Sequence, residues 1–104
     1  MLDKATVREI ALKYAEEVKK VLNPVKIILF GSYVNGTPWE YSDIDIAVVM
    51  NGYQGNRLKT GAMLSALRES VSFDIEPHLL DETRDRSGFL EHVKKTGEII
   101  YEAT

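Results

Sequence analysis

The sequence contains no cysteine, so disulfide bonds, thiolate metal sites and cysteine nucleophiles are excluded. It has no apolar run near the roughly 20 residues that a membrane-spanning helix needs, so we expect a cytoplasmic protein. Positive charge is not in excess, because 13 Lys and Arg residues stand against 16 Asp and Glu residues and give a net charge of −3. This balance argues against a broad surface that binds nucleic-acid phosphates nonspecifically.

What is present has the composition of an ordinary folded domain. The 104 residues are 44% hydrophobic and 28% charged, which predicts a single domain, residues 1–104, with one modest core. Hydrophobic spacing and turn residues predict helices at 4–22, 57–71 and 88–95, and extended segments at 25–30, 44–50, 73–80 and 98–101. This order predicts an α/β (α+β) fold, a small mixed sheet flanked by helices.

Two short motifs lie around the loop between the first two predicted strands. Gly31-Ser32 ends the first strand, and Asp43-Ile44-Asp45 opens the second after ten intervening residues. A glycine lets backbone N–H groups approach an anion closely, and a serine adds a hydroxyl donor. Residues two apart on a strand share one face, so Asp43 and Asp45 can bind the same divalent cations, for which Mg²⁺ is the natural candidate.

The third predicted strand carries further ionisable groups on one face. Asp74, Glu76 and His78 alternate with apolar residues, so one of the two carboxylates can supply a third ligand or accept a proton. Asp74 is the first choice and Glu76 the alternative, because the register is uncertain by two residues. His78 is either a proton shuttle or metal ligand, or an ordinary strand residue.

The stretch from Leu29 to Gly36, followed by Ser42 to Val48, closely resembles the nucleotidyltransferases of the DNA polymerase β superfamily. The resemblance is to the minimal nucleotidyltransferase group, whose hallmark is Gly-Ser, ten residues and then Asp-x-Asp. It covers residues 25–80 and implies a nucleotidyltransferase-like fold for the chain.

The resemblance also implies a role for each matching residue. Gly31 and Ser32 would hold the β- and γ-phosphates of a nucleoside triphosphate. Asp43, Asp45 and Asp74 would be the catalytic carboxylates and would bind two Mg²⁺ ions. An acceptor hydroxyl would attack the α-phosphorus, with pyrophosphate as the leaving group.

The same resemblance implies a donor, an acceptor and a partner. The donor would be ATP, from which AMP is transferred to a hydroxyl. Stand-alone members of the group often act as antitoxins that adenylylate a small helical HEPN-type toxin, so a tyrosine or another hydroxyl of such a partner is the expected acceptor. No membrane partner and no strong nucleic-acid binding are expected. The sequence leaves open whether the chain forms a homo-oligomer.

One loop departs from the family pattern. Family members commonly carry Arg or Lys just after Gly-Ser and again before the second glycine, whereas this chain has Tyr33, Val34 and Asn35 there. Charge-assisted contacts to the triphosphate are therefore missing from this loop. The alternative function is accordingly a catalytically weak or inactive module that binds and neutralises a partner protein.

Overall fold

The structure is a computed structural model that describes residues 2–36 and 43–104. The elements follow in the order α1 (Lys4–Val21), β1 (Lys26–Phe30), α2 (Ser32–Asn35), β2 (Ile44–Met50), α3 (Arg57–Leu67), the 3₁₀ helix η1 (Arg68–Ser70), β3 (Ile75–Asp81), α4 (Phe89–Thr96) and β4 (Glu98–Glu102). The mixed α/β fold predicted from the sequence is confirmed. Among the described residues, no helix is long and apolar enough to cross a membrane.

The four strands form one mixed sheet in the order β3-β2-β1-β4. Strand β1 runs antiparallel to both β2 and β4, whereas β2 and β3 are parallel. The parallel pair is joined through α3, as a crossover of this kind requires. Strand β3 lies at an edge of the sheet, which is where Pro77 is tolerated because proline has no N–H to donate.

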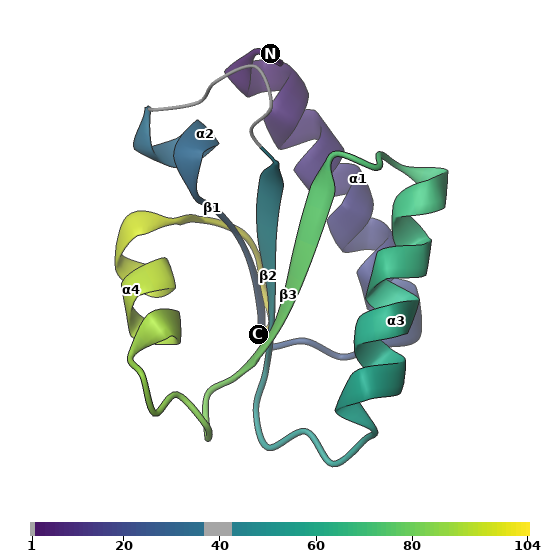
Figure 1. Ribbon diagram of the computed structural model, residues 1–104, viewed down its shortest axis with the longest axis vertical. Helices are drawn as coiled ribbons and strands as arrows, with labels where there is room; N and C mark the ends of the chain where they lie inside the picture. Colours follow the sequence, from purple (N-terminus) through teal and green to yellow (C-terminus); the bar gives the residue numbers. More distant parts are fainter. Residues whose placement is uncertain (1, 37–42) are drawn as a thin grey trace.

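Helices cover both faces of this sheet (Figure 1), with α1 and α3 on one face and α4 on the other. Alternate residues of β1 separate accordingly, because Ile27 packs toward α1 and Ile28 toward α4. In β2, Ile44, Ile46 and Val48 belong to the core beneath α1 and α3. Their neighbours on β2, Asp45 among them, therefore point to the face that carries α4.

The first helix shows how local sequence fixes an element. Asp3 is its N-cap, and the carboxylate of Asp3 accepts a hydrogen bond of 2.7 Å from the backbone N–H of Thr6. Lys19 and Lys20 lie in its last turn, where positive charge complements the helix dipole. The predicted start and end of this helix are confirmed to within a residue. The four-residue helix α2 was not predicted.

Candidate active site

The turn after β1 brings the backbone close to a carboxylate. Gly31 has a φ of +86° and a ψ of −156°, a region that only glycine adopts readily. A Cβ atom at Gly31 would overlap the carboxylate of Asp45. Both the conformation and the contact therefore require glycine, and the missing side chain leaves the backbone beside Asp45.

Helix α2 begins directly after this glycine. The carbonyl oxygen of Gly31 accepts hydrogen bonds of 3.1 Å and 3.0 Å from the backbone N–H groups of Val34 and Asn35. Ser32 is half-buried as the first residue of α2, while the side chain of Tyr33 is buried in the core beneath α1. The loop is thus held by its own backbone and by Tyr33, and Ser32 stays partly accessible.

Asp45 of β2 is flanked by residues of both neighbouring strands. It pairs with Phe30 of β1 and with Glu76 of β3. Asp43 directly precedes β2 and is exposed, and its carboxyl group is close enough to Glu76 to raise the pKa of Glu76. The ends of β1, β2 and β3 therefore gather Gly31, Asp43, Asp45 and Glu76 at one end of the sheet.

Glu76, His78 and Asp45 form a compact group of donors. One ligand atom from each lies within 4.8 Å of the other two. The Nε2 atom of His78 is 3.1 Å from Oδ1 of Asp45, and these side chains are 28% and 22% exposed. Two carboxylates and an imidazole, partly open to solvent, are a donor set that fits a divalent cation.

An aromatic wall borders this group. The ring of His78 meets Phe30 edge-on with 5.0 Å between centroids, and Phe89 of α4 lies 6.3 Å from His78. Phe30 also contacts Phe89 in a T-shaped arrangement at 5.7 Å. Phe30 and Phe89 carry no sequence signal of a site, since an apolar residue that ends a strand or opens a helix ordinarily belongs to the core.

The carboxyl group of Glu76 has an altered proton affinity. Partial desolvation raises the pKa of Glu76 above its usual value, and the nearby carboxyls of Asp45 and Asp43 raise it further. His78 acts in the opposite direction, to a smaller extent than the desolvation. A carboxylate with a raised pKa is a better proton acceptor than its neighbours.

Asp74 stands apart from this group. It precedes β3, its side chain is exposed, and its backbone carbonyl accepts a 2.8 Å hydrogen bond from the N–H of Ile44. Among the described residues, the donor group contains Glu76 and not Asp74. Of the predicted site residues, Asp45 belongs to the donor group, Gly31 lies against Asp45 and Asp43 lies near Glu76. Asp74 lies outside the group, with Glu76 in the place considered for it.

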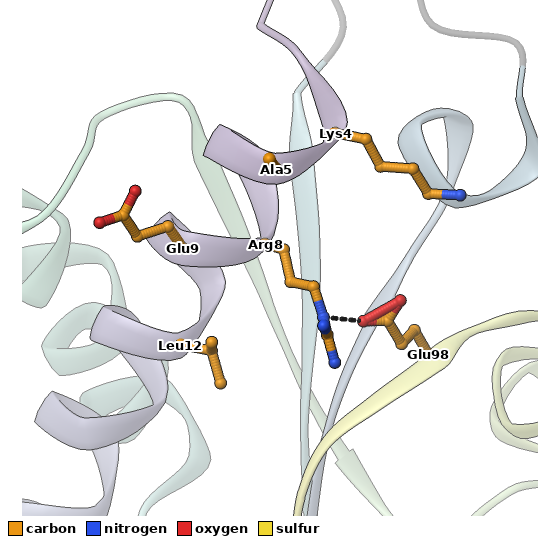
Figure 2. Close-up of a pocket in the computed structure, with 6 residues that line it drawn as sticks. All are labelled: Lys4, Ala5, Arg8, Glu9, Leu12 and Glu98. Carbon is orange, nitrogen blue, oxygen red and sulfur yellow. Dashed lines mark hydrogen bonds and ion pairs between the residues drawn. The ribbon is translucent and has the colours of Figure 1, made fainter.

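A depression of about 570 Å³ lies elsewhere, between α1 and the start of β4 (Figure 2). Its lining includes the apolar side chain of Leu12 and the ion pair between Arg8 and Glu98, which is 2.6 Å long. Because Arg8 and Glu98 already neutralise each other, this depression offers no free carboxylate cluster. The depression therefore does not compete with the carboxylates at the end of the sheet as a site for metal chemistry.

Comparisons with known proteins agree with this fold. No curated protein matches the chain. A solved protein of Sulfolobus solfataricus, provisionally assigned as a nucleotidyltransferase, is 25% identical with a TM-score of 0.71, covering 95% of this chain and 83% of that one. A mutant of the MntA–HpeT toxin–antitoxin (22% identity, TM-score 0.65, 88% and 73% covered) and a toxin–antitoxin with AMP-PNP (22%, 0.63, 99% and 76%) share the fold. The family model for polymerase beta nucleotidyltransferases matches residues 12–104, so the chain belongs to that family.

Proposed function

We propose that this nucleotidyltransferase transfers AMP from ATP onto a hydroxyl group of a protein partner and uses two Mg²⁺ ions. The observation that carries this proposal is the approach of the Gly31 backbone to Asp45, with Glu76 beside the same carboxylate. A backbone open to phosphate next to clustered carboxylates suits a triphosphate with bound metal. A solved neighbour of the same fold carries AMP-PNP, an observation that supports the choice of nucleotide.

The carboxylates present fit the metal ions that the family implies. Asp43, Asp45 and Glu76 would hold them, and we assign the third carboxylate to Glu76 in place of Asp74. Bound metal ions would neutralise negative charge on the triphosphate and on the departing pyrophosphate. The pKa of Glu76 is raised mainly by partial desolvation and further by the neighbouring carboxyls of Asp45 and Asp43, so a bound cation would stabilise the ionised form of this group.

The remaining steps fall to the side chains and the backbone. Gly31 and Ser32 would bind the β- and γ-phosphates through their backbone N–H groups and the serine hydroxyl. The carboxylate of Glu76 would take the proton of the acceptor hydroxyl. The hydroxyl oxygen then forms a bond to the α-phosphorus, while the bond from that phosphorus to the bridging oxygen breaks and pyrophosphate leaves.

The proposed acceptor is a tyrosine or another hydroxyl of a small helical HEPN-type toxin, which makes the chain an antitoxin acting in the cytoplasm. Two solved neighbours of the same fold come from toxin–antitoxin structures, which supports a protein partner. The chain also carries no cysteine and no excess of basic residues, so a protein hydroxyl suits it better than a thiol intermediate or a nucleic-acid end.

Labelled nucleotide tests the transfer directly. The chain, co-purified with its protein partner, is incubated with Mg²⁺ and ATP labelled at the α-phosphate. We expect label on the partner, no label from γ-labelled ATP, and loss of transfer in Asp45→Asn. Asp74→Asn is the matched control and should retain transfer. An unmodified partner, in a protein that binds nucleotide normally, would sink the proposal.

A second function has one observation in its favour. Of the two loop positions where family members commonly carry a cation, Tyr33 is buried in the core and Asn35 is exposed but uncharged, so neither supplies a charge to the triphosphate. This favours a module that neutralises its partner by binding alone. If Asp43→Asn still neutralises the partner in cells, binding is the function; if neutralisation is lost while the complex still forms, transfer is.

A further inference from the structure

We propose that His78 is a nitrogen ligand of the metal site, so that the site prefers a first-row transition dication such as Mn²⁺ over Mg²⁺. The proposal rests on the proposed function, since it concerns the same site. It departs from a purely carboxylate site because one of the three clustered donors is an imidazole.

The spacing of the donors suits direct coordination. Nε2 of His78 lies 3.1 Å from Oδ1 of Asp45. Adjacent ligands of an octahedral ion bound at about 2.1 Å are separated by about 3.0 Å, so these two atoms already have the spacing of neighbouring ligands. Glu76 supplies a third atom within 4.8 Å of both. Without a cation, Nε2 and the carboxylate can satisfy each other by a hydrogen bond.

The imidazole is also held in place for this task. The ring of Phe30 packs edge-on against the imidazole, and the ring of Phe89, from α4, lies close to it as well. The parallel register sets Ala47 of β2 opposite His78, and alanine leaves room for the ring above the sheet. A ligand whose ring orientation is fixed by packing loses little further freedom on binding.

Ligand chemistry then decides which ion is preferred. Mg²⁺ favours oxygen donors and rarely takes an imidazole, whereas transition dications accept nitrogen and carboxylate donors together. A donor set of two carboxylates and one imidazole therefore raises affinity for Mn²⁺ relative to Mg²⁺. Mg²⁺ still binds through the carboxylates, but without the nitrogen.

Electron paramagnetic resonance of bound Mn²⁺ reads this ligand directly. The purified chain with Mn²⁺ and a non-hydrolysable ATP analogue should show hyperfine coupling from an imidazole nitrogen. The sequence has two histidines, so His92→Gln, at an exposed position of α4, is the matched control. The coupling should persist in His92→Gln and vanish in His78→Gln. Calorimetry should show a loss of Mn²⁺ affinity of about 10- to 100-fold in His78→Gln and a smaller loss for Mg²⁺.

A second measurement covers the case in which His78→Gln does not fold. Protein grown with ¹⁵N-labelled histidine should show the nitrogen coupling change to that of the heavier isotope. Bound Mn²⁺ without imidazole coupling would overturn the role of His78 and leave the proposed function standing. If neither Mn²⁺ nor Mg²⁺ binds even with nucleotide present, both the ligand role and the metal-dependent function fail.

Discussion

The backbone of Gly31 lies directly against the carboxylate of Asp45, at the point where β1 ends and β2 begins. The two residues are 14 positions apart in the sequence, yet antiparallel pairing sets Phe30 opposite Asp45 and thereby places the next residue beside it. The Gly-Ser motif and the Asp-x-Asp motif thus lie side by side and form one site.

Replacing Gly31 by alanine should damage this site in two ways. The added Cβ overlaps the Asp45 carboxylate and must displace it, and the backbone region costs a non-glycine residue on the order of 1–3 kcal/mol. We expect reduced stability and loss of Mg²⁺-dependent nucleotide binding, measured by urea unfolding and calorimetry.

Gly36→Ala is the matched control for this change. Gly36 also has a positive φ, +77°, but a Cβ there meets nothing within 4 Å. It should therefore lose stability through backbone strain alone and keep nucleotide binding. Equal loss of binding in both variants would show that the contact with Asp45 does not matter.

Glu76→Gln should stabilise the metal-free protein at neutral pH. Because the pKa of Glu76 is raised in the folded state, ionisation of this group opposes folding. Its effect on stability is absent below the ordinary carboxyl pKa of about 4.3 and grows as pH rises through the raised pKa. The gain should stay below about 1 kcal/mol, because the side chain is exposed and screened.

Thermal unfolding checks this prediction across pH, with Glu69→Gln at an exposed position of η1 as the control. The advantage of Glu76→Gln should disappear below pH 4, and added Mg²⁺ should stabilise the native chain more than the variant. A variant that is less stable than the native chain at pH 7 without metal would contradict the raised pKa of Glu76.

Asp81 has the opposite electrostatic role. Its buried carboxylate accepts hydrogen bonds from the backbone N–H groups of Gly52, Tyr53 and Thr83, at 2.9, 2.7 and 2.9 Å, and from the Thr83 hydroxyl at 2.6 Å. These bonds, with that of the Thr83 hydroxyl as the largest effect, hold the pKa of Asp81 well below its usual range. The carboxylate thus ties the turn after β2 to the end of β3.

Asp81→Asn should destabilise the fold by about 1–3 kcal/mol at pH 7, because it removes the charge and one acceptor. A lowered pKa contributes stability that is fully present above the ordinary carboxyl pKa and is lost as pH falls toward the folded value. The difference between native and variant chains in urea unfolding should therefore shrink below about pH 4. A difference that does not change with pH would contradict this assignment.

Tyr14→Phe tests how α1 and α3 are joined. The fully buried hydroxyl of Tyr14 donates a 2.5 Å hydrogen bond to the carbonyl of Leu64, and burial raises the pKa of Tyr14. Losing this bond should cost about 1 kcal/mol in urea unfolding without affecting nucleotide binding. Tyr101→Phe, on the edge strand β4, should cost less; an equal cost would show that the bond to Leu64 contributes nothing.

Most of the fold follows from local sequence signals. The stripe of apolar residues along α1 and the buried runs of β1 and β2 each have a local physical cause. The order of the strands in the sheet has no such local signal, because it depends on which strands pair in the folded chain. Helix α2 was missed because four residues, Ser32–Asn35, are too few to show a helical period.

The candidate site, like the fold, was predictable where it depends on local spacing and not where it depends on strand pairing. Spacing in the sequence singled out Gly31, Asp43 and Asp45, and alternation placed Asp74, Glu76 and His78 on one face of the third predicted strand. Alternation cannot say which of these lies opposite Asp45, since that depends on the register of two strands joined through α3. The parallel pairing selects Glu76 and brings His78 within reach of the same carboxylate.

Calorimetric titration of a non-hydrolysable ATP analogue, with and without Mg²⁺, tests the nucleotidyltransferase site most directly. Asp45→Asn, Glu76→Gln and Asp74→Asn are compared with the native chain. We expect Mg²⁺-dependent binding in the native chain and in Asp74→Asn, and its loss in Asp45→Asn and Glu76→Gln. Mg²⁺-dependent binding that survives Asp45→Asn, or no binding in the native chain, would contradict a metal-dependent nucleotide site at this end of the sheet.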